Sequence, residues 1–402
     1  MKWETYKLKQ LCSEIVDCVN KTAPTSDVPT PYKMLRTSDI RDGKINLENL
    51  NCVTKEVYEK WTRRGKLQKG DVIFTREAPL GEVGLVREEK NYFLGQRLVL
   101  FRANNKMCDG RFLMYSLLWH DNKQAIISKG VGSTVAHLRV PECENIEIKV
   151  PDLDVQHRIA DILSAYDDLI ENNQKQIKLL EEAAQRLYKE WFVDLRFPGH
   201  ENTKIVDGVP EGWNKSTVSE ASAILRRGIS PKYNEKARGI VINQKCIRQT
   251  IVSYDEARTQ EKKYPAELEM MESDIVICST GAGTLGRVGQ IFEAKGNATL
   301  DSHVTLIRAN ERVGQQYLFW SLKMQQDYLM SAGKGSTNQL ELSRETIGNC
   351  EIIVPERKMA GQAEKNFAAI HDKMKECSMQ IARLREARDL LLPKLMSGEV
   401  EV

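Results

Sequence analysis

The segment DVQHRIADILSAYDDLIENNQKQIKLLEEAAQRLYKEWF, residues 154–192, decides the fold of this 402-residue chain. It contains no proline or glycine, and it is rich in Leu, Ala, Glu, Gln, Lys and Arg, the residues that favour helices. Its apolar residues return every three or four positions along a heptad seam, which is typical of helices that pack side by side. The pattern predicts one long helix over residues 156–197 that pairs with another helix.

The partner helix is predicted about 204 residues further on, in AEKNFAAIHDKMKECSMQIARLREARDLLLPKLMSGEV, residues 363–400. The seam keeps its register there, with polar exceptions at Asn173 and Arg388. Two unrelated surface helices would be the simpler interpretation, but a repeated seam favours an antiparallel pair. The residues expected to form the contact are Leu163, Ile170, Ile177, Leu180, Leu187 and Trp191 in the first helix and Phe367, Met374, Ile381, Leu384, Leu391 and Leu395 in the second.

The sequences that precede the two helices also repeat, at an offset of 203 to 206 residues. One short match would be chance, but five in the same order indicate a tandem duplication. The matches are GDVIF 70–74 with SDIVI 273–277, LGEVG 80–84 with LGRVG 285–289, RAN 102–104 with 308–310, GVGST 130–134 with GKGST 333–337, and IEIKVP 146–151 with EIIVP 351–355.

The duplication predicts globular halves at residues 1–155 and 198–355, followed by helices at 156–197 and 356–402. Each half is expected to be a mixed α/β (α+β) domain, with short strands between glycine turns and short amphipathic helices. A linker rich in proline and glycine, residues 196–213, separates the two copies. The expected architecture is a duplicated, pseudo-two-fold molecule with two long antiparallel coiled-coil helices.

The chain carries no recognisable catalytic signature. SAGKGST at 331–337 has the wrong spacing for a phosphate-binding loop, and GAGTLG at 281–286 precedes a strand rather than a helix. The six histidines have no ligand spacing and the nine cysteines form no CxxC pair, so neither a zinc site nor a disulfide framework is expected. No apolar stretch is long enough to cross a membrane, and a signal peptide is not apparent. These features predict a cytoplasmic protein with no catalytic residue, metal site or membrane partner.

Net charge gives only weak evidence for a nucleic-acid partner. The chain carries +3 overall; residues 1–155 have 25 Lys and Arg against 21 Asp and Glu, and residues 198–355 have 19 of each. A protein that holds DNA by itself usually shows a more basic face. If this chain binds DNA, it must cluster its basic residues or borrow phosphate contacts from a partner.

The order of these features resembles the specificity subunit of type I restriction-modification systems. Two variable halves each end in a short strand and a proline, each precedes a heptad-patterned helix, and GDVIFT at 70–75, LGEVG, the GST loops and PEGW at 210–213 also fit. Each motif is weak alone, but their order and duplication are specific, and the resemblance covers nearly the whole chain. It departs from the family at PERKMAGQAEK, residues 355–365, where the Pro-x-x-x-Gln pattern before the helix is blurred. The start of the second helix is therefore open by a few residues.

The resemblance implies a division of labour between subunits. Each half would be a target-recognition domain that contacts one part of a split double-stranded DNA sequence, and the paired helices would fix the gap and dock two modification subunits. Those methyltransferase partners bind S-adenosylmethionine and methylate adenine. A restriction subunit, when present, adds cleavage that uses ATP and Mg. This chain would itself be non-catalytic and would bind no cofactor.

The chemistry of base and phosphate recognition suggests which side chains would contact DNA. Arg and Lys suit guanine, Asn and Gln suit adenine, and Ser and Thr suit phosphate. The adjacent arginines 63–64 and 226–227 are the sharpest candidates, because such pairs in loops are costly to satisfy internally. The full expected set is Arg36, Arg63, Arg64, Thr75, Arg76, Gln96, Arg97, Ser133 and Thr134 in the first half, and Arg226, Arg227, Lys245, Ser279, Thr280, Ser302, His303, Ser336 and Asn338 in the second.

Two other functions stay open on the sequence alone. A single-chain enzyme, such as a fused endonuclease-methyltransferase, is disfavoured by the missing motifs. A structural adaptor would use the coiled coil to hold two protein partners without nucleic acid. Exchanging residues 1–155 for those of a relative would then leave any DNA specificity unchanged.

Overall fold

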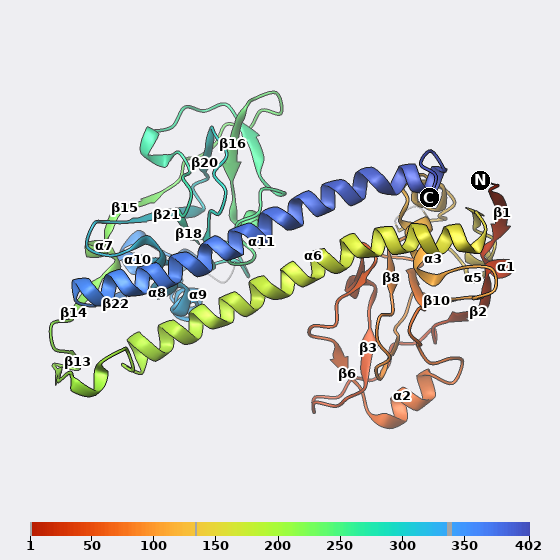
Figure 1. The fold of residues 1–402 in the computed structure, drawn as a ribbon, viewed down its shortest axis with the longest axis horizontal. Coiled ribbons are helices and arrows are strands. Elements are labelled where there is room, and N and C mark those ends of the chain that lie inside the picture. Colours follow the sequence, from red (N-terminus) through yellow and green to blue (C-terminus); the bar gives the residue numbers. More distant parts are fainter. Residues whose placement is uncertain (1, 133–134, 336–339) are drawn as a thin grey trace. The chain divides into compact units, whose positions relative to one another are not determined.

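The computed structural model describes residues 2–132, 135–335 and 340–402 (Figure 1). Its contacts group the chain into two compact units, Met1–Glu171 with Ile381–Val402, and Asn172–Gln380. Each unit therefore contains one globular half together with part of both long helices. The sequence analysis placed each long helix in a segment of its own, residues 156–197 and 356–402. The contacts instead divide each helix between the two units.

The first half contains small sheets and short helices. Its strands are β1 (Glu4–Lys7), β2 (Cys12–Asp17), β3 (Lys33–Leu35), β4 (Ile40–Arg41), β5 (Lys44–Ile45), β6 (Asn51–Cys52), β7 (Val72–Thr75), β8 (Val83–Leu85), β9 (Tyr92–Leu94), β10 (Leu98–Ala103) and β11 (Glu147–Val150). Its helices are α1 (Leu8–Leu11), α2 (Lys55–Trp61), α3 (Gly110–Leu118), α4 (His120–Ser128) and α5 (Val140–Glu144). The largest sheet is antiparallel, in the order β2-β10-β7-β8, and smaller sheets are β6-β3-β9, β1-β11 and β4-β5.

The second half repeats this topology. Its strands are β12 (Ile205–Val206), β13 (Val209–Pro210), β14 (Asn214–Thr217), β15 (Ser222–Arg227), β16 (Gly239–Ile242), β17 (Arg258–Gln260), β18 (Ile275–Cys278), β19 (Val288–Gln290), β20 (Ala298–Leu300), β21 (Val304–Ala309) and β22 (Glu351–Val354). Its helices are α7 (Val218–Ala221), α8 (Gln315–Met324), α9 (Gln326–Ser331) and α10 (Arg344–Gly348). The sheets β15-β21-β18-β19, β17-β16-β20 and β14-β22 repeat those of the first half, whereas β12-β13 here and β4-β5 there have no counterpart. The predicted duplication of mixed α/β halves is confirmed.

The central strands of the first half bury both faces because alternate side chains enter different cores. Phe74 and Phe101 pack with α3 and the start of the following long helix, while Ile73 and Leu100 pack with the three-stranded sheet. Successive residues of a strand point to opposite faces, so a strand covered on both faces is buried along its whole length, as VIFT is. Burial of each such side chain contributes about 1.5–3 kcal/mol.

The two long helices are α6 (Leu153–Tyr188), which ends in a π-helical turn at Lys189–Val193, and α11 (Arg357–Ser397). In the first unit the start of α6 shares a core with the end of α11, through residues such as Ile159 and Leu395. In the second unit the end of α6 shares a core with the start of α11, through residues such as Ala184 and Phe367. The helices are therefore antiparallel within each unit.

The seam residues also belong to the cores of the globular halves. Leu163 lies in one core with Phe112 of α3, and the ring of Phe367 lies 6.4 Å from that of Trp320 on α8. The seam thus joins each helix to a globular half as well as to the other helix. The buried seam positions are Leu163, Ile170, Trp191, Phe367, Met374, Ile381 and Leu395, and the half-buried ones are Ile177, Leu180, Leu187, Leu384 and Leu391.

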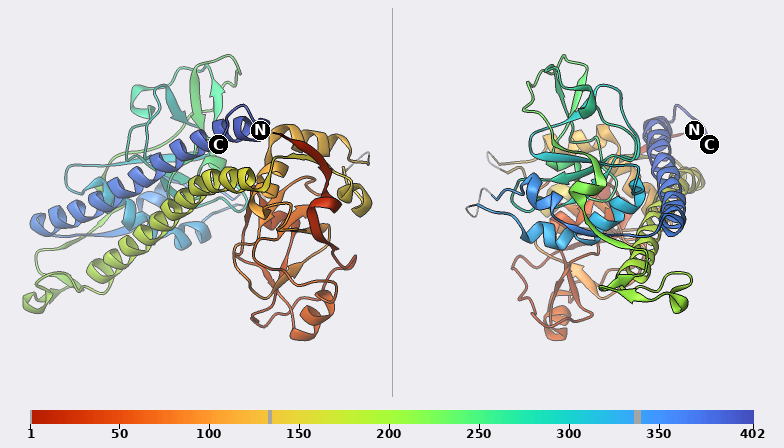
Figure 2. Two further views of the ribbon diagram at one scale, coloured as in Figure 1. Left: turned by 45° about the vertical axis from the view of Figure 1, so that its right-hand side comes forward. Right: turned by 90° about the vertical axis from the view of Figure 1, so that its left-hand side faces the viewer.

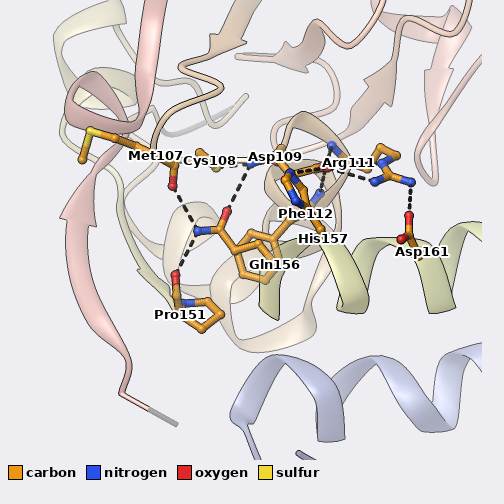
Figure 3. A network of polar contacts seen from close by, with 9 residues as sticks. All are labelled: Met107, Cys108, Asp109, Arg111, Phe112, Pro151, Gln156, His157 and Asp161. Carbon is orange, nitrogen blue, oxygen red and sulfur yellow. Dashed lines mark hydrogen bonds and ion pairs between the residues drawn. The ribbon is translucent and has the colours of Figure 1, made fainter. Parts of the chain in front are cut away.

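A buried glutamine fixes the start of α6 against the first half (Figure 3). The Gln156 amide donates to the carbonyls of Met107 at 3.0 Å and Pro151 at 2.9 Å, and its oxygen accepts from the backbone N–H of Asp109 at 3.1 Å. The Asp109 carboxylate in turn caps α3 by accepting from the N–H groups of Arg111 and Phe112. One side chain therefore satisfies the backbone where two helices begin.

In the second half a different residue caps the helix that is equivalent to α3. Glu364 of α11 accepts from the N–H groups of Gln316 at 3.1 Å and Tyr317 at 2.9 Å, and so caps α8. This carboxylate does the work that Asp109 performs for α3. The start of α11, left open by the sequence, is Arg357.

The two ends of the described chain meet in the first unit (Figure 2). Trp3, Val400 and Val402 pack against the same core, and a side-chain carbon on Gly398 would approach Trp3 Nε1 to 2.7 Å. Across residues 2–132, 135–335 and 340–402, none of the helices combines the length and apolar character needed to cross a bilayer.

Candidate nucleic-acid interface

A surface rich in cations lies on the first half where three segments meet: the end of α2 with the residues after it, the β2–β3 loop and the β9–β10 turn. Trp61 Nε1 donates to the carbonyl of Lys21 at 3.4 Å, and Thr22 Oγ1 donates to Gln96 Oε1 at 3.0 Å. These bonds tie the segments into one surface, which we call the first cationic surface. Its polar members are Lys21, Lys60, Arg63, Arg64, Gln96 and Arg97.

Local sequence explains why α2 presents these cations. Thr54 caps the helix by accepting from the Val57 N–H, and Tyr58 anchors it in a small core with Phe93. The chain then turns outward, and Arg63 and Arg64 are both exposed. Within the described part of the chain neither guanidinium has an ion pair or a hydrogen bond, so both are available to phosphate or guanine.

Three other expected contacts of the first half are occupied inside the protein. Arg36 makes a bidentate ion pair with the buried Asp39, at 3.0 and 2.8 Å. Arg76 donates to the Leu138 carbonyl at 3.1 Å and pairs with Asp17. Thr75 is fully buried and hydrogen-bonded to the backbone of its own loop. Burial excludes Thr75 as a DNA contact, and the pairing of Arg36 and Arg76 speaks against them.

Arg97 stands at the end of the β9–β10 turn. Its φ of +69° is a left-handed conformation that residues other than glycine adopt rarely. The side chain is half exposed and its Nε lies 3.3 Å from Glu77 Oε2. The predicted contacts Ser133 and Thr134 fall outside the described residues.

In the second half the predicted pair of adjacent arginines, Arg226 and Arg227, forms ion pairs within the protein. Arg226 and Arg227 belong to strand β15 rather than to a loop. Arg226 pairs with Glu267, while Arg227 donates to the Leu342 carbonyl at 2.8 Å and pairs with Glu341 at 2.6 Å. The expectation that this pair stays unsatisfied was therefore wrong, because its partners lie 40 or more residues away in sequence.

The remaining candidates of the second half lie around the β20–β21 turn. The exposed His303 forms a 2.7 Å hydrogen bond between its Nδ1 and Thr280 Oγ1, and Ser302 beside it is half-buried. Lys245 is exposed at a short 3-10 turn, whereas Ser279 is fully buried and bonded to Thr305 at 2.6 Å. Burial excludes Ser279, and the predicted Ser336 and Asn338 fall outside the described residues.

Backbone hydrogen bonds show which positions of the two halves are equivalent. The Arg76 N–H donates to the Arg97 carbonyl, and the Ser279 N–H donates to the His303 carbonyl, both at 2.8 Å. Arg97 and His303 therefore occupy the same place in the two copies. The backbone hydrogen bond at this turn is the same in both halves, while the exposed side chain changes.

Sequence reasoning missed several members of these surfaces. Lys60 and Trp61 lie on α2 beside the predicted arginines, whereas Lys21 joins the first cationic surface only through folding, because it comes from the β2–β3 loop. In the second half the Arg258 guanidinium lies 3.5 Å from the ring centre of Tyr233, which holds an exposed cation in place. Their only signal in the sequence is a basic or aromatic residue in a segment between strands.

The described residues contain no group of three or more His, Cys, Asp or Glu placed to hold a metal ion. The cysteines are mostly buried, and burial raises the pKa of the Cys12 and Cys278 thiols to about 12. A thiol of that pKa stays protonated at neutral pH, whereas zinc binds the thiolate. The polar groups of these surfaces suit hydrogen bonding to an anion or a base edge.

Comparison with known proteins agrees with this geometry. The family model for the type I restriction modification DNA specificity domain matches residues 1–182. The HindI type I restriction enzyme specificity subunit of Haemophilus influenzae is 24% identical over 91% of this chain and 94% of its own length. This chain is similar to type I restriction-modification specificity subunits along most of its length.

Other specificity subunits match along most of their length. The MjaIX specificity subunit of Methanocaldococcus jannaschii is 26% identical over 83% of this chain and 78% of its own. The crystal structure of the type I S subunit from M. genitalium has a TM-score of 0.62 at 18% identity, with 98% of this chain and 96% of that chain covered. The chain therefore shares its fold, both halves and both helices, with that structure.

Proposed function

We propose that this chain reads a split sequence in double-stranded DNA, with each half addressing one part, and brings modification subunits to that site. The observation that carries the proposal is the pair of equivalent positions Arg97 and His303. Two copies of one scaffold that expose different side chains at the same turn can select different bases, because base edges are read by side-chain chemistry.

The long helices support the docking of protein partners. They carry apolar side chains that stay exposed although the seam is covered, Leu169, Leu179, Met379 and Leu390. Exposed apolar residues on otherwise paired helices suit contact with another subunit. The partners are two modification subunits that bind S-adenosylmethionine and methylate adenine, joined in a complete system by restriction subunits that use ATP and Mg. The chain itself is non-catalytic, binds no cofactor, and acts in the cytoplasm, where the DNA lies.

Mapping of methylated adenines tests this function. The chain is purified together with its modification partner and incubated with genomic DNA and S-adenosylmethionine, and the modified positions are read by sequencing. The expected result is one consensus with two defined parts and an unspecified gap of constant length. Methylation without a split consensus would reject the proposal. The modification partner alone is the control, and the chain alone should transfer no methyl group.

A further inference from the structure

The two halves differ most in charge in the segment that enters the central strand of the large sheet. The first connection is residues 53–71, between β6 and β7, and the second connection is residues 261–274, between β17 and β18. These connections are topologically equivalent. The first contains six Lys and Arg against three Asp and Glu, and the second contains two against five. The same place in the fold is therefore cationic in one half and anionic in the other.

The first connection also differs in structure. It contains the whole of α2, whereas the second has only the 3-10 turn Ala266–Leu268. On its surface Lys60, Arg63 and Arg64 are exposed, and within the described ranges none of them has an acidic partner. Lys21, also exposed, is held beside them by the Trp61 hydrogen bond. Four cations from two segments thus share one surface with no carboxylate paired to them.

The acids of the second connection neutralise cations of their own half. Glu261 pairs with Lys232 and Glu267 with Arg226. Asp274 makes a bidentate pair with Arg308, as Asp71 of the first connection does with Arg102, so the halves differ in the pairs of Glu261 and Glu267. A cation in such a pair contributes little to counterion release, because its charge is already balanced before DNA arrives.

We infer that the first connection is the phosphate-binding element of this protein, and that the first half supplies most of its salt-dependent affinity for duplex DNA. The second half contributes to base reading with little electrostatic attraction of its own. This inference rests on the proposed function and adds to it an unequal division of binding between two halves of equal fold. Each phosphate neutralised by Lys or Arg steepens the fall of log affinity with log salt by about 0.9.

The test is a salt titration of the intact chain with a fluorescein-labelled 40-base-pair duplex of random sequence, followed by anisotropy. Arg63→Ala/Arg64→Ala should lower the slope of log affinity against log salt by about 2, for two lost phosphate contacts. Lys9→Ala/Lys149→Ala is the matched control, since it removes the same charge from exposed positions elsewhere on the first half, and its slope should equal that of the wild type. Arg63→Lys/Arg64→Lys keeps the charge and should keep the slope.

Equal slopes for the wild type and Arg63→Ala/Arg64→Ala would overturn the inference. An equal fall in slope in Arg63→Ala/Arg64→Ala and in Lys9→Ala/Lys149→Ala would overturn it too. If the slope of log affinity against log salt also fell in Arg63→Lys/Arg64→Lys, the arginines would be assigned to base contacts and the phosphate role would be overturned. Unchanged thermal midpoints for all variants exclude misfolding as the cause. A split methylation consensus, together with an unchanged slope in Arg63→Ala/Arg64→Ala, would contradict this inference and still support the proposed function.

Discussion

Arg388 of α11 donates from Nη1 to Oδ1 of Asp167 on α6 at 2.6 Å, inside the first unit. The same carboxylate accepts from the Tyr115 hydroxyl at 2.6 Å, so one buried acid connects both long helices and α3. The polar exception that the seam shows at Arg388 is therefore one partner of an ion pair. The equivalent positions of the second half, Ala184 and His371, have no such pair between them in the described structure.

Breaking this pair should destabilise the first unit. Arg388→Met leaves the Asp167 carboxylate buried without its cation, and loss of one partner of a buried pair costs about 3–5 kcal/mol. Asp167→Asn/Arg388→Met should lose less, because no charge is then left unpaired. Urea denaturation followed by circular dichroism measures both. Arg385→Met, at an exposed position of the same helix, is the control; a single Arg388 variant as stable as this control would contradict the role of the pair.

Seam positions should tolerate a carboxylate according to their burial. Ile177 and Leu180 lie on the predicted seam but are only half-buried, so Ile177→Glu and Leu180→Glu should cost less than a carboxylate at a buried seam position. Ile170→Glu is the sharper variant, because Ile170 is 1% exposed and a buried unpaired carboxylate costs several kcal/mol. Leu179→Glu on the same helix, at a residue 63% exposed, should change the thermal midpoint little. A similar midpoint for the two variants would argue against helix pairing through the seam.

The second unit should lose stability as pH falls below about 6.5, the ordinary histidine value. Burial lowers the pKa of His371, against the opposing effects of Asp372 and Glu272 and with a smaller contribution from Lys375. Its Nε2 is buried and has no hydrogen-bond partner among the described residues, and its ring centre lies 4.4 Å from that of Phe292. A group whose folded pKa is lowered takes up its proton more readily when unfolded, so stability rises with pH across that window.

His371→Phe removes the proton-binding group but keeps a ring against Phe292. Thermal unfolding of wild type and variant at pH 7.5 and pH 5.5 measures the effect. The drop in midpoint between the two pH values should be smaller in the variant. Identical drops would show that other groups control the acid sensitivity of this unit.

The equivalent turn residues should each control one part of the DNA target. Arg97→His should change or weaken base preference in the part read by the first half and leave the other part intact. His303→Arg is the matched variant and should act on the other part only. The two consensus sequences are read by mapping methylated adenines; a change in both parts, or in neither, would remove these residues from the set that sets specificity.

Features that depend on residues close together in the sequence can be predicted from it, and features that depend on contacts between distant residues cannot. The duplication and the two helices are visible in the sequence because they depend on local composition and a regular seam. The internal pairing of Arg226 and Arg227 is not, because Glu267 and Glu341 approach only after the strands assemble. Thr75 looked available for the same reason, since its burial depends on the loop that folds over it.

The candidate surface was predicted only in part. Arg63 and Arg64 stood out as adjacent cations, and they remain exposed because α2 turns them away from the core. Lys21 gave no comparable signal, since nothing in a single sequence indicates that the β2–β3 loop reaches Trp61. Side chains that gather from separate loops require the fold before they can be grouped.

The most direct test of the central claim is an exchange of one half. Residues 1–155 are replaced by those of a relative with a different target, and methylated adenines are mapped for both complexes with the same modification partner. Two halves that read independently should give a new sequence in one part of the consensus, with the other part and the gap length unchanged. An unaltered consensus, or loss of both parts at once in a complex that still assembles and methylates, would contradict the account.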